Sequence, residues 1–417
     1  MAFTRRSLIG RGALLVASGF LAPSFITRTA IALDRPTPAL DASRKNMILV
    51  VLQLSGGNDG INTLIPFADP DYSKLRPSLG FAPDEVLHLT DSVGLNPNLG
   101  KLKALYDQGK VAIVQGVGYP NPNRSHFRSM DIWHSARPET FERSGWLGRY
   151  VSACQCAADN ALPAISVGDQ LNTLFWTDTT LVPAVASIGA FSFLTDTRYK
   201  NDRTLQMQAL QNIYSQAGNW SAYEGLIRRG TLQALAGSDE LQKLAASYQT
   251  PVQYPANNGL ANQLKMVAQV IAGNVGTRLF SVSMGGYDTH ANQKPTQDRN
   301  LAQLGDALDA FMQDLANIHQ QDNVVVMTFS EFGRRVKQNG SNGTDHGTAE
   351  PMFIIGNKVQ GGLYGTYPSL SDLDNNGDLK FNADFRSVYA GILKDVVGAD
   401  PAPILGGSFD PIDVVRT

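Results

Sequence analysis

Hydrophobic residues occur along this chain in two kinds of segment. Short continuous runs rich in β-branched residues predict strands buried on both faces, whereas longer segments with an apolar residue every three or four positions predict helices. The predicted strands are residues 47–54, 111–117, 164–167, 279–284, 323–329 and 352–356, and the predicted helices are residues 99–107, 260–271, 297–319 and 384–397. Because strands and helices alternate, we expect an α/β protein with a doubly wound, mostly parallel sheet.

Acidic residues and histidines follow two of the predicted strands. They are Asp288 and His290 after residues 279–284, and Glu331, Asp345 and His346 after residues 323–329. In open α/β sheets ligands bind beyond the carboxyl ends of the strands, so we expect these side chains to meet. Asp288 and His290 are separated by one residue and point to the same side of an extended segment. Such a set fits a divalent cation, Zn²⁺, Mn²⁺, Mg²⁺ or Ca²⁺, unless these polar side chains only hold loops together.

A glycine-rich turn at residues 55–60 follows the first predicted strand. Three glycines in six positions let the backbone turn sharply and approach a ligand closely. The same turn presents Asp59 at the carboxyl end of the strand, so we include Asp59 among the candidate metal ligands. An ordinary Asn-Asp-Gly turn would account for the same residues.

A serine lies between two cationic side chains after the strand at 111–117, in the order Arg124, Ser125, His126. A serine at the start of a predicted helix leaves backbone N–H groups free to meet an anion. A hydroxyl nucleophile needs an electropositive setting, so we take Ser125 as the candidate nucleophile, with Arg124 and His126 beside it. The alternative is that Ser125 only caps the helix.

The N-terminus has the form of an export signal. Arg5 and Arg6 precede an apolar run at residues 13–26, and a small-x-small site ends at Ala32. This pattern predicts a twin-arginine signal peptide at residues 1–32, which the twin-arginine translocase would carry to the periplasm or beyond, and a linker at 33–45. The apolar run is short for a membrane span, so an uncleaved anchor is the less favoured alternative, and we expect no stable span after cleavage.

Composition bounds the rest of the chain. With 43% hydrophobic and 17% charged residues and a net charge of −2, it predicts a sizeable core and no basic surface for nucleic acid. Residues 46–417 are expected to form one α/β domain, in which 169–258 is either a helical insertion or cap, or a set of ordinary surface helices. Cys154 and Cys156 are one residue apart, which is poor geometry for a mutual disulfide, and we expect them to be structurally incidental.

Five motifs carry a resemblance to known families. They are QLSGGNDG at 53–60, GGYDTH at 285–290, SEFGR at 330–334, TDHG at 344–347 and DFRSVY at 384–389. Together they resemble the domain-of-unknown-function 1501 family of proteins exported by the twin-arginine pathway.

A remoter resemblance is to the alkaline phosphatase and sulfatase superfamily, in which similar residues hold two divalent metals around a hydroxyl nucleophile. It implies an alkaline phosphatase-like fold and metal-ligand roles for Asp59, Asp288, His290, Glu331 and His346. Where that superfamily typically has Asp-His, this chain has Glu-Phe at 331–332, so one of the two cations would lose a nitrogen ligand.

These observations predict an exported, metal-dependent hydrolase of phosphate or sulfate esters, acting on a small molecule or a polymer. The metal would polarise the ester, Ser125 or a water molecule would attack, and Arg124 or Arg334 would stabilise the developing charge. Because fold analogy does not establish function, the alternative is an exported binding or assembly protein that keeps the fold with a degenerate site.

Overall fold

The computed structural model describes residues 47–416 except 155, 157–159, 179, 190, 192, 194, 196, 197, 199, 200, 217 and 219. The predicted signal peptide at 1–32 and the linker at 33–45 lie outside the described residues. Among the described helices, none combines the length and the apolar character that crossing a membrane requires.

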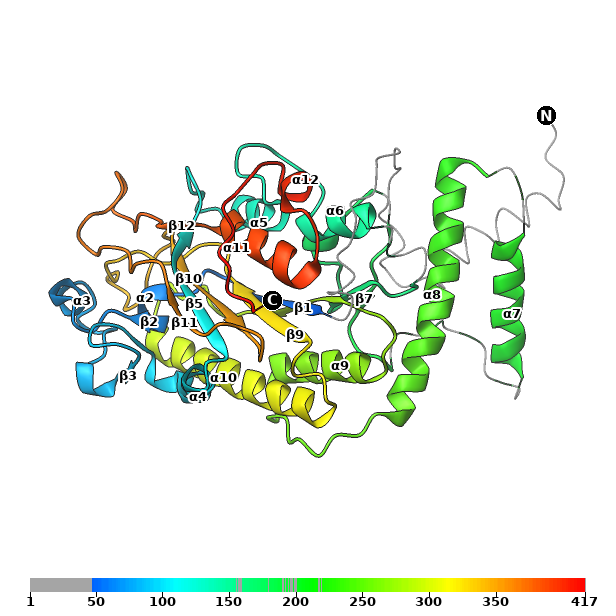
Figure 1. Cartoon of the computed structure of the whole chain (residues 1–417), viewed down its shortest axis with the longest axis horizontal. Helices are drawn as coiled ribbons and strands as arrows, with labels where there is room; N and C mark the ends of the chain where they lie inside the picture. Colours follow the sequence, from blue (N-terminus) through cyan, green and yellow to red (C-terminus); the bar gives the residue numbers. More distant parts are fainter. Residues whose placement is uncertain are drawn as a thin grey trace.

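A nine-stranded sheet forms the centre of the molecule (Figure 1). Its strands are β1 (Ile48–Leu54), β5 (Val111–Gly118), β6 (Ala164–Val167), β7 (Ala184–Val185), β8 (Leu279–Met284), β9 (Val324–Phe329), β10 (Glu350–Ile355), β11 (Gly362–Tyr364) and β12 (Ala383–Asp384). The order is β11-β5-β10-β9-β1-β8-β6-β7, and β12 pairs with β5. Every pairing is parallel except those of β10 with β5 and β9. The predicted mostly parallel sheet is therefore confirmed.

Helices cover both faces of this sheet, which makes the fold doubly wound. They are α2 (Gly60–Thr63), α3 (Pro70–Leu75), α4 (Gly100–Asp107), α5 (His126–Ser135), α6 (Trp146–Ala153), α7 (Asp202–Ser215), α8 (Ala222–Ser247), α9 (Gly259–Ala272), α10 (Gln293–Asn317), α11 (Phe385–Ile392) and α12 (Pro401–Leu405). Short helical turns are η3 (Pro83–Glu85), η4 (Pro97–Leu99), η5 (Thr173–Phe175) and the π-helical η6 (Leu393–Val397). In the view of Figure 1, α9 and α10 lie below the sheet and α5, α6, α11 and α12 above it.

Strand β1 shows why both faces are covered. Its side chains alternate between faces: Val50 and Leu52 belong to one buried cluster, whose partners include Leu308 of α10. Leu49 and Val51 belong to the other cluster, which contains aromatic residues of α5, α6 and α11. A second, small antiparallel sheet is built from β2 (Leu64–Ile65), β4 (Gly94–Leu95) and β3 (Leu87–His88).

The segment 169–258 contributes both to the sheet and to a helical layer. Strand β7 extends the central sheet through its parallel pairing with β6. Helix α8 lies against the preceding chain, because Ser238 Oγ donates to Phe191 O (3.0 Å) and Gln242 Nε2 donates to Ile188 O (2.9 Å). In Figure 1, α7 and α8 stand at the opposite end of the molecule from α2, which follows β1. These two helices therefore lie away from the carboxyl end of β1.

Cys154 and Cys156 are joined in a disulfide. Our expectation that the two cysteines are incidental was wrong. Helix α6 ends at Ala153, and the turn that follows brings the two Cα atoms to 5.1 Å, within the range in which disulfides form.

Candidate functional site

The loops that carry the candidate residues meet at one edge of the sheet because of strand direction. Strands β1, β8 and β9 are parallel and end together, with Leu54 beside Met284 and Gln53 beside Phe329. Strand β5 runs in the same direction, and the antiparallel β10 starts at this edge, where Glu350 lies beside Val117. The segments after β1, β5, β8 and β9 and the segment before β10 are therefore neighbours.

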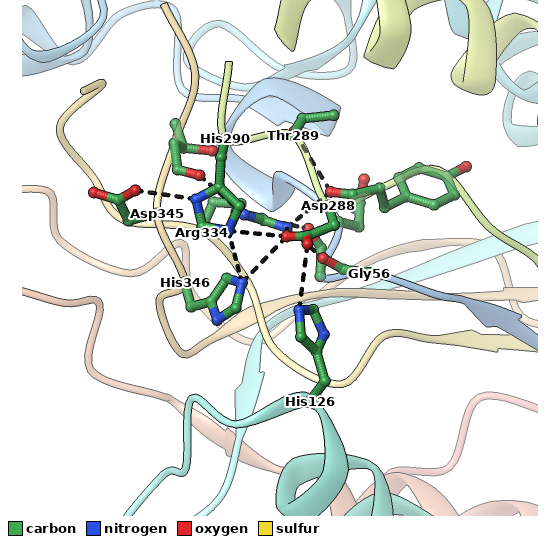
Figure 2. A network of polar contacts seen from close by, with 12 residues as sticks. Gly56, His126, Asp288, Thr289, His290, Arg334, Asp345 and His346 are labelled. Atoms are coloured by element: carbon green, nitrogen blue, oxygen red, sulfur yellow. Dashed lines mark hydrogen bonds and ion pairs between the residues drawn. The ribbon is translucent and has the colours of Figure 1, made fainter. Parts of the chain in front are cut away.

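Three imidazole rings surround the carboxylate of Asp288 (Figure 2). The Nε2 atoms of His290 and His346 each lie 3.1 Å from Asp288 Oδ1, and the Nε2 atom of His126 lies 3.4 Å from Oδ2. Ligand atoms of His126, Asp288 and His346 all lie within 4.8 Å of one another. A tetrahedral zinc ion with bonds of about 2.0 Å holds its ligand atoms roughly 3.3 Å apart. The spacing of this cluster therefore fits a small divalent cation.

The far nitrogen of each ring is held by an oxygen. His126 Nδ1 lies 3.0 Å from Glu331 Oε1, His290 Nδ1 lies 3.1 Å from Asp345 Oδ1, and His346 Nδ1 lies 2.8 Å from the carbonyl of Arg124. A carbonyl only accepts, so Nδ1 of His346 carries the proton and its Nε2 lone pair faces Asp288. Metal-binding histidines are held in this way, with the outer ring nitrogen bonded to a carboxylate or carbonyl.

Charges at the cluster favour the metal-binding protonation states. Burial opposes the ionisation of Asp288, but the hydrogen bond from Arg334 and the positive charge of its guanidinium outweigh it, and the pKa of Asp288 is lowered to about 2. Burial lowers the pKa of His346, and the hydrogen bond from His290 lowers the pKa of Asp345. At neutral pH the cluster therefore presents an ionised carboxylate and a neutral His346, as metal ligation requires.

Arg334 is buried behind the cluster and binds it together. Its guanidinium donates to the carbonyls of Gly57 (2.7 Å), Thr344 (2.9 Å) and Tyr287 (2.9 Å) and to Asp288 Oδ1 (2.7 Å). All three of its nitrogens are used within the protein, so Arg334 fixes the orientation of Asp288 and ties three loops together. The structure gives it no solvent-facing position from which to meet a substrate.

The glycine-rich turn lets other parts of the chain approach β1. A Cβ atom on Gly56 would lie 2.4 Å from the backbone nitrogen of Asp288, and one on Gly57 would lie 2.3 Å from the ring of Phe332. Both glycines also have positive φ, at 118° and 81°. We predicted that the backbone of this turn approaches a ligand closely. In the structure it instead approaches protein atoms of the segments that follow β8 and β9.

Glu331 lies directly behind His126 and is almost fully buried. Besides His126, its Oε1 accepts the backbone N–H of Gly56 at 2.8 Å. Its own carbonyl accepts hydrogen bonds from Ser129 Oγ and from Trp133 Nε1, both in α5. These bonds fix the start of α5 against the end of β9 and so position His126. Glu331 and Asp345 thus support ligating histidines, whereas we had listed both as direct ligands.

Asp59 lies apart from the histidine cluster. Its carboxylate forms a buried ion pair with Arg76 of the chain just after α3, with Arg76 Nη2 3.1 Å from Asp59 Oδ1, and it also accepts from Gln293. Its two oxygens are thereby satisfied within the protein. The sequence contains no pattern that singles out Arg76 as this partner, since 17 residues separate the two.

The two remaining candidates face different surroundings. The guanidinium of Arg124 pairs with Asp378, so only the Arg124 carbonyl reaches the cluster, through His346. Ser125 stands at the N-cap position of α5, is exposed, and makes no capping bond with its side chain. Ser125 directly precedes His126 of the cluster in the sequence. Its hydroxyl does not cap the helix.

Comparisons with solved structures give matches of low identity. A protein in the alkaline phosphatase superfamily from Vibrio parahaemolyticus aligns with a TM-score of 0.40 and 11% identity, over 92% of this chain and 76% of that one. Alkaline phosphatase from the Antarctic bacterium TAB5 aligns with a TM-score of 0.32 and 14% identity, over 79% and 95%. The lipoteichoic acid synthase LtaP from Listeria monocytogenes aligns with a TM-score of 0.39 and 8% identity, over 91% and 80%.

No protein with a curated description matches this sequence significantly. A family model does match, over residues 110–383. This region is more than half of the chain and contains His126, Asp288, His290 and His346. The motifs at 285–290, 330–334 and 344–347, from which the resemblance was inferred, all lie inside it. The chain therefore belongs to the protein family of unknown function DUF1501.

Proposed function

We propose that this protein is an exported, metal-dependent hydrolase of phosphate or sulfate esters. One observation carries the proposal: the Nε2 atoms of His126, His290 and His346 converge on the carboxylate of Asp288. Imidazole nitrogens and a carboxylate oxygen are the ligand types that bind zinc and similar ions, and His126, Asp288 and His346 have the spacing of such a site. Nearly half of each of the Asp288 and His290 side chains is exposed, so a substrate can reach the site.

A divalent cation held there would act as a Lewis acid on a phosphoryl or sulfuryl oxygen. The residues of the chain set the geometry around it. Arg334 holds Asp288 in place, and Glu331, Asp345 and the Arg124 carbonyl hold the three rings. Such outer partners keep the ligands pre-oriented, which is a condition for stabilising charge as it develops.

The proposed nucleophile is the hydroxyl of Ser125. It adjoins His126 in sequence, it is exposed, and its hydroxyl makes no capping bond. A serine hydroxyl is a weak nucleophile unless a base or a cation lowers its proton affinity, and a cation held by the neighbouring cluster would supply this activation. Attack by a water molecule is the alternative, and it would leave Ser125 without a role in the reaction.

Export by the twin-arginine pathway is part of this proposal. The paired arginines at positions 5 and 6 support it, and so does the disulfide between Cys154 and Cys156. Disulfides persist in the periplasm and outside the cell and are rare in the cytosol. The periplasm or the extracellular space is therefore the proposed location, and the twin-arginine translocase is the proposed partner during export.

A second candidate function is metal-dependent binding without turnover. The ion pair between Asp59 and Arg76 favours it, because a carboxylate neutralised by an arginine is a poor ligand for a second cation. Under this alternative the histidine cluster still binds one metal and presents it to an anionic ligand.

Activity assays separate the two candidates. Purified protein is reconstituted in turn with Zn²⁺, Mn²⁺, Mg²⁺ and Ca²⁺ and assayed on aryl and alkyl esters of phosphate and of sulfate. The proposal predicts hydrolysis of at least one class, loss of that activity with a chelator, and loss in His346→Ala. Binding of phosphate or sulfate with no turnover in any metal would instead establish the binding protein.

A further inference from the structure

A cavity of about 320 Å³ lies beside the histidine cluster. Its walls come from the end of β5 and the loop after it, from the segment after β9, and from the loop that precedes β12. The apolar lining consists mainly of Tyr119, Pro122, Phe332, Leu379 and Phe381. A pocket of this size and character is typical of small-molecule sites, which lie within roughly 300–1,000 Å³.

Phe332 connects the cavity to the metal-binding residues. Its ring lines the cavity, and it also lies against His346, with ring centroids 4.3 Å apart, and near His126, at 5.0 Å. The phenyl ring is itself buried. The cavity and the metal ligands are therefore separated by the thickness of one aromatic ring, which is a suitable spacing for two parts of one small substrate.

Arg124 makes a second connection. Its carbonyl accepts the Nδ1 hydrogen of His346, and its guanidinium pairs with Asp378. Asn123 and Leu379, which adjoin these two residues, both line the cavity. The loop that orients a metal-binding histidine is thus tied by an ion pair to the opposite wall of the cavity, so the two sites form one structural unit.

The size of the cavity limits what it can hold. A dry cavity of about 150 Å³ is enough to bind benzene, so this one has room for an aromatic group of one or two rings. Although Asn123, Thr348, Asp374 and Lys380 also line the cavity, most of its lining is apolar, which favours such a group over a hydrated sugar, since burying hydroxyls without partners is costly. A polymer chain would exceed the volume.

We propose that this cavity binds the aromatic leaving group of the substrate, which makes aryl phosphates or aryl sulfates the substrate class. This inference rests on the proposed function. In direct hydrolysis, the oxygen of water bonds to phosphorus or sulfur, the bond to the aryl oxygen breaks, and the phenol leaves with one proton of that water molecule. In the route through Ser125, the serine oxygen forms this bond first and the phenol leaves with the hydroxyl proton; water then cleaves the seryl ester and returns a proton to Ser125. The cavity contributes by holding the ring while the charged end meets the metal ligands.

Two variants change the cavity wall, and a third variant serves as the control. Phe381→Ala removes an apolar wall residue that is 36% exposed, so it should fold normally. Gly118→Ala adds a Cβ atom 2.8 Å from Phe381 Cβ, a contact so close that this wall of the cavity must shift. The control is Phe141→Ala, the same chemical change at a ring that is 84% exposed and does not line the cavity.

The measurements are phenol binding by ligand-observed NMR and kcat/KM for phenyl, ethyl and n-octyl phosphates and the matching sulfates. We expect the preference for phenyl over ethyl to fall roughly tenfold in Phe381→Ala, as for a lost apolar contact in a pocket, with phenol binding weakened in parallel. Gly118→Ala should weaken both as well, and Phe141→Ala should change neither.

The outcomes separate this inference from the proposed function. Hydrolysis without a phenyl preference, or with a preference for n-octyl, would overturn the aromatic pocket and leave the hydrolase standing. Phenol binding that is lost in Phe381→Ala, in a protein that hydrolyses no ester, would leave an aromatic-binding cavity and overturn the ester substrate class. Equal phenol binding in all four proteins would overturn the cavity assignment.

Discussion

The Nε2 atoms of His290 and His346 lie 3.0 Å apart. Both rings already direct their Nδ1 atoms to oxygen acceptors, Asp345 and the Arg124 carbonyl. In their neutral forms, neither ring then has a proton left to place between the two Nε2 atoms, and two lone pairs face each other beside the carboxylate of Asp288. A divalent cation held by these residues would remove this repulsion, because it would accept electron density from the facing lone pairs.

Asp59→Asn should lower stability without lowering metal content. The substitution leaves the buried guanidinium of Arg76 without its carboxylate, which typically costs about 3–5 kcal/mol. The matched control is Asp71→Asn, which breaks the exposed pair with Lys74 and should cost under about 1 kcal/mol. Chemical denaturation and metal analysis of both variants test this, and a loss of metal in Asp59→Asn would return Asp59 to the metal site.

Ser125→Ala should lower ester hydrolysis by on the order of a hundredfold if its hydroxyl attacks the substrate. Because this side chain makes no capping bond, the thermal midpoint should stay nearly unchanged. A capping role would instead cost about 1 kcal/mol of stability and leave turnover intact. Turnover and thermal midpoint measured on one preparation decide between them. Full activity would assign the attack to water.

The buried His134 should make the protein less stable in mild acid. Burial lowers the pKa of His134 from 6.5 to about 3, while Thr173 and Gln53 occupy its two ring nitrogens. Between these pH values the unfolded chain binds a proton that the folded chain does not, so the stabilising contribution is complete above pH 6.5 and falls as pH decreases. The slope should be about 1.4 kcal/mol per pH unit.

His134→Gln tests this linkage. Urea denaturation of both proteins is measured from about pH 7 down to pH 4.5, with a chelator present so that metal loss does not contribute. Other titrating groups are common to the two proteins and cancel in the difference. The variant should be less stable at neutral pH and show a flatter dependence on pH. Parallel curves would mean that folding does not change the pKa of His134.

Replacement of both Arg5 and Arg6 by lysine should block export, because the twin-arginine pathway recognises this pair. Cell fractionation and intact mass should then show full-length protein in the cytoplasm, whereas the unmodified chain should yield a product that begins at Leu33. Appearance of that product outside the inner membrane in the double variant would contradict export by this route.

Much of the fold was predictable because the strands are continuous apolar runs. The predicted strands at 164–167 and 279–284 coincide with β6 and β8, and the strand predicted at 323–329 begins one residue before β9. The pairing of Asp288 and His290 with His346 followed from the rule that parallel strands end at one edge. His126 obeys the same rule, since it follows the parallel strand β5, and this signal could have placed it in the metal cluster.

The remaining roles depend on contacts between distant residues, which local patterns do not encode. Asp59 and Glu331 both follow buried strands, yet one pairs with Arg76 and the other supports His126. Arg334 has the charge for substrate binding, but four backbone carbonyls and Asp288 use its donors. Whether a polar group faces a substrate or the protein depends on the packing around it.

The metal content of the purified protein tests the central claim most directly. After incubation with each divalent ion and desalting, the wild-type chain should retain about one ion, as expected for a single four-ligand centre. His290→Ala and His346→Ala should lose it together with the thermal stabilisation that a bound ion provides. The exposed His319, changed to Asn, serves as the control and should bind normally. A wild-type protein that retains no ion, or equal retention in all four proteins, would contradict the account.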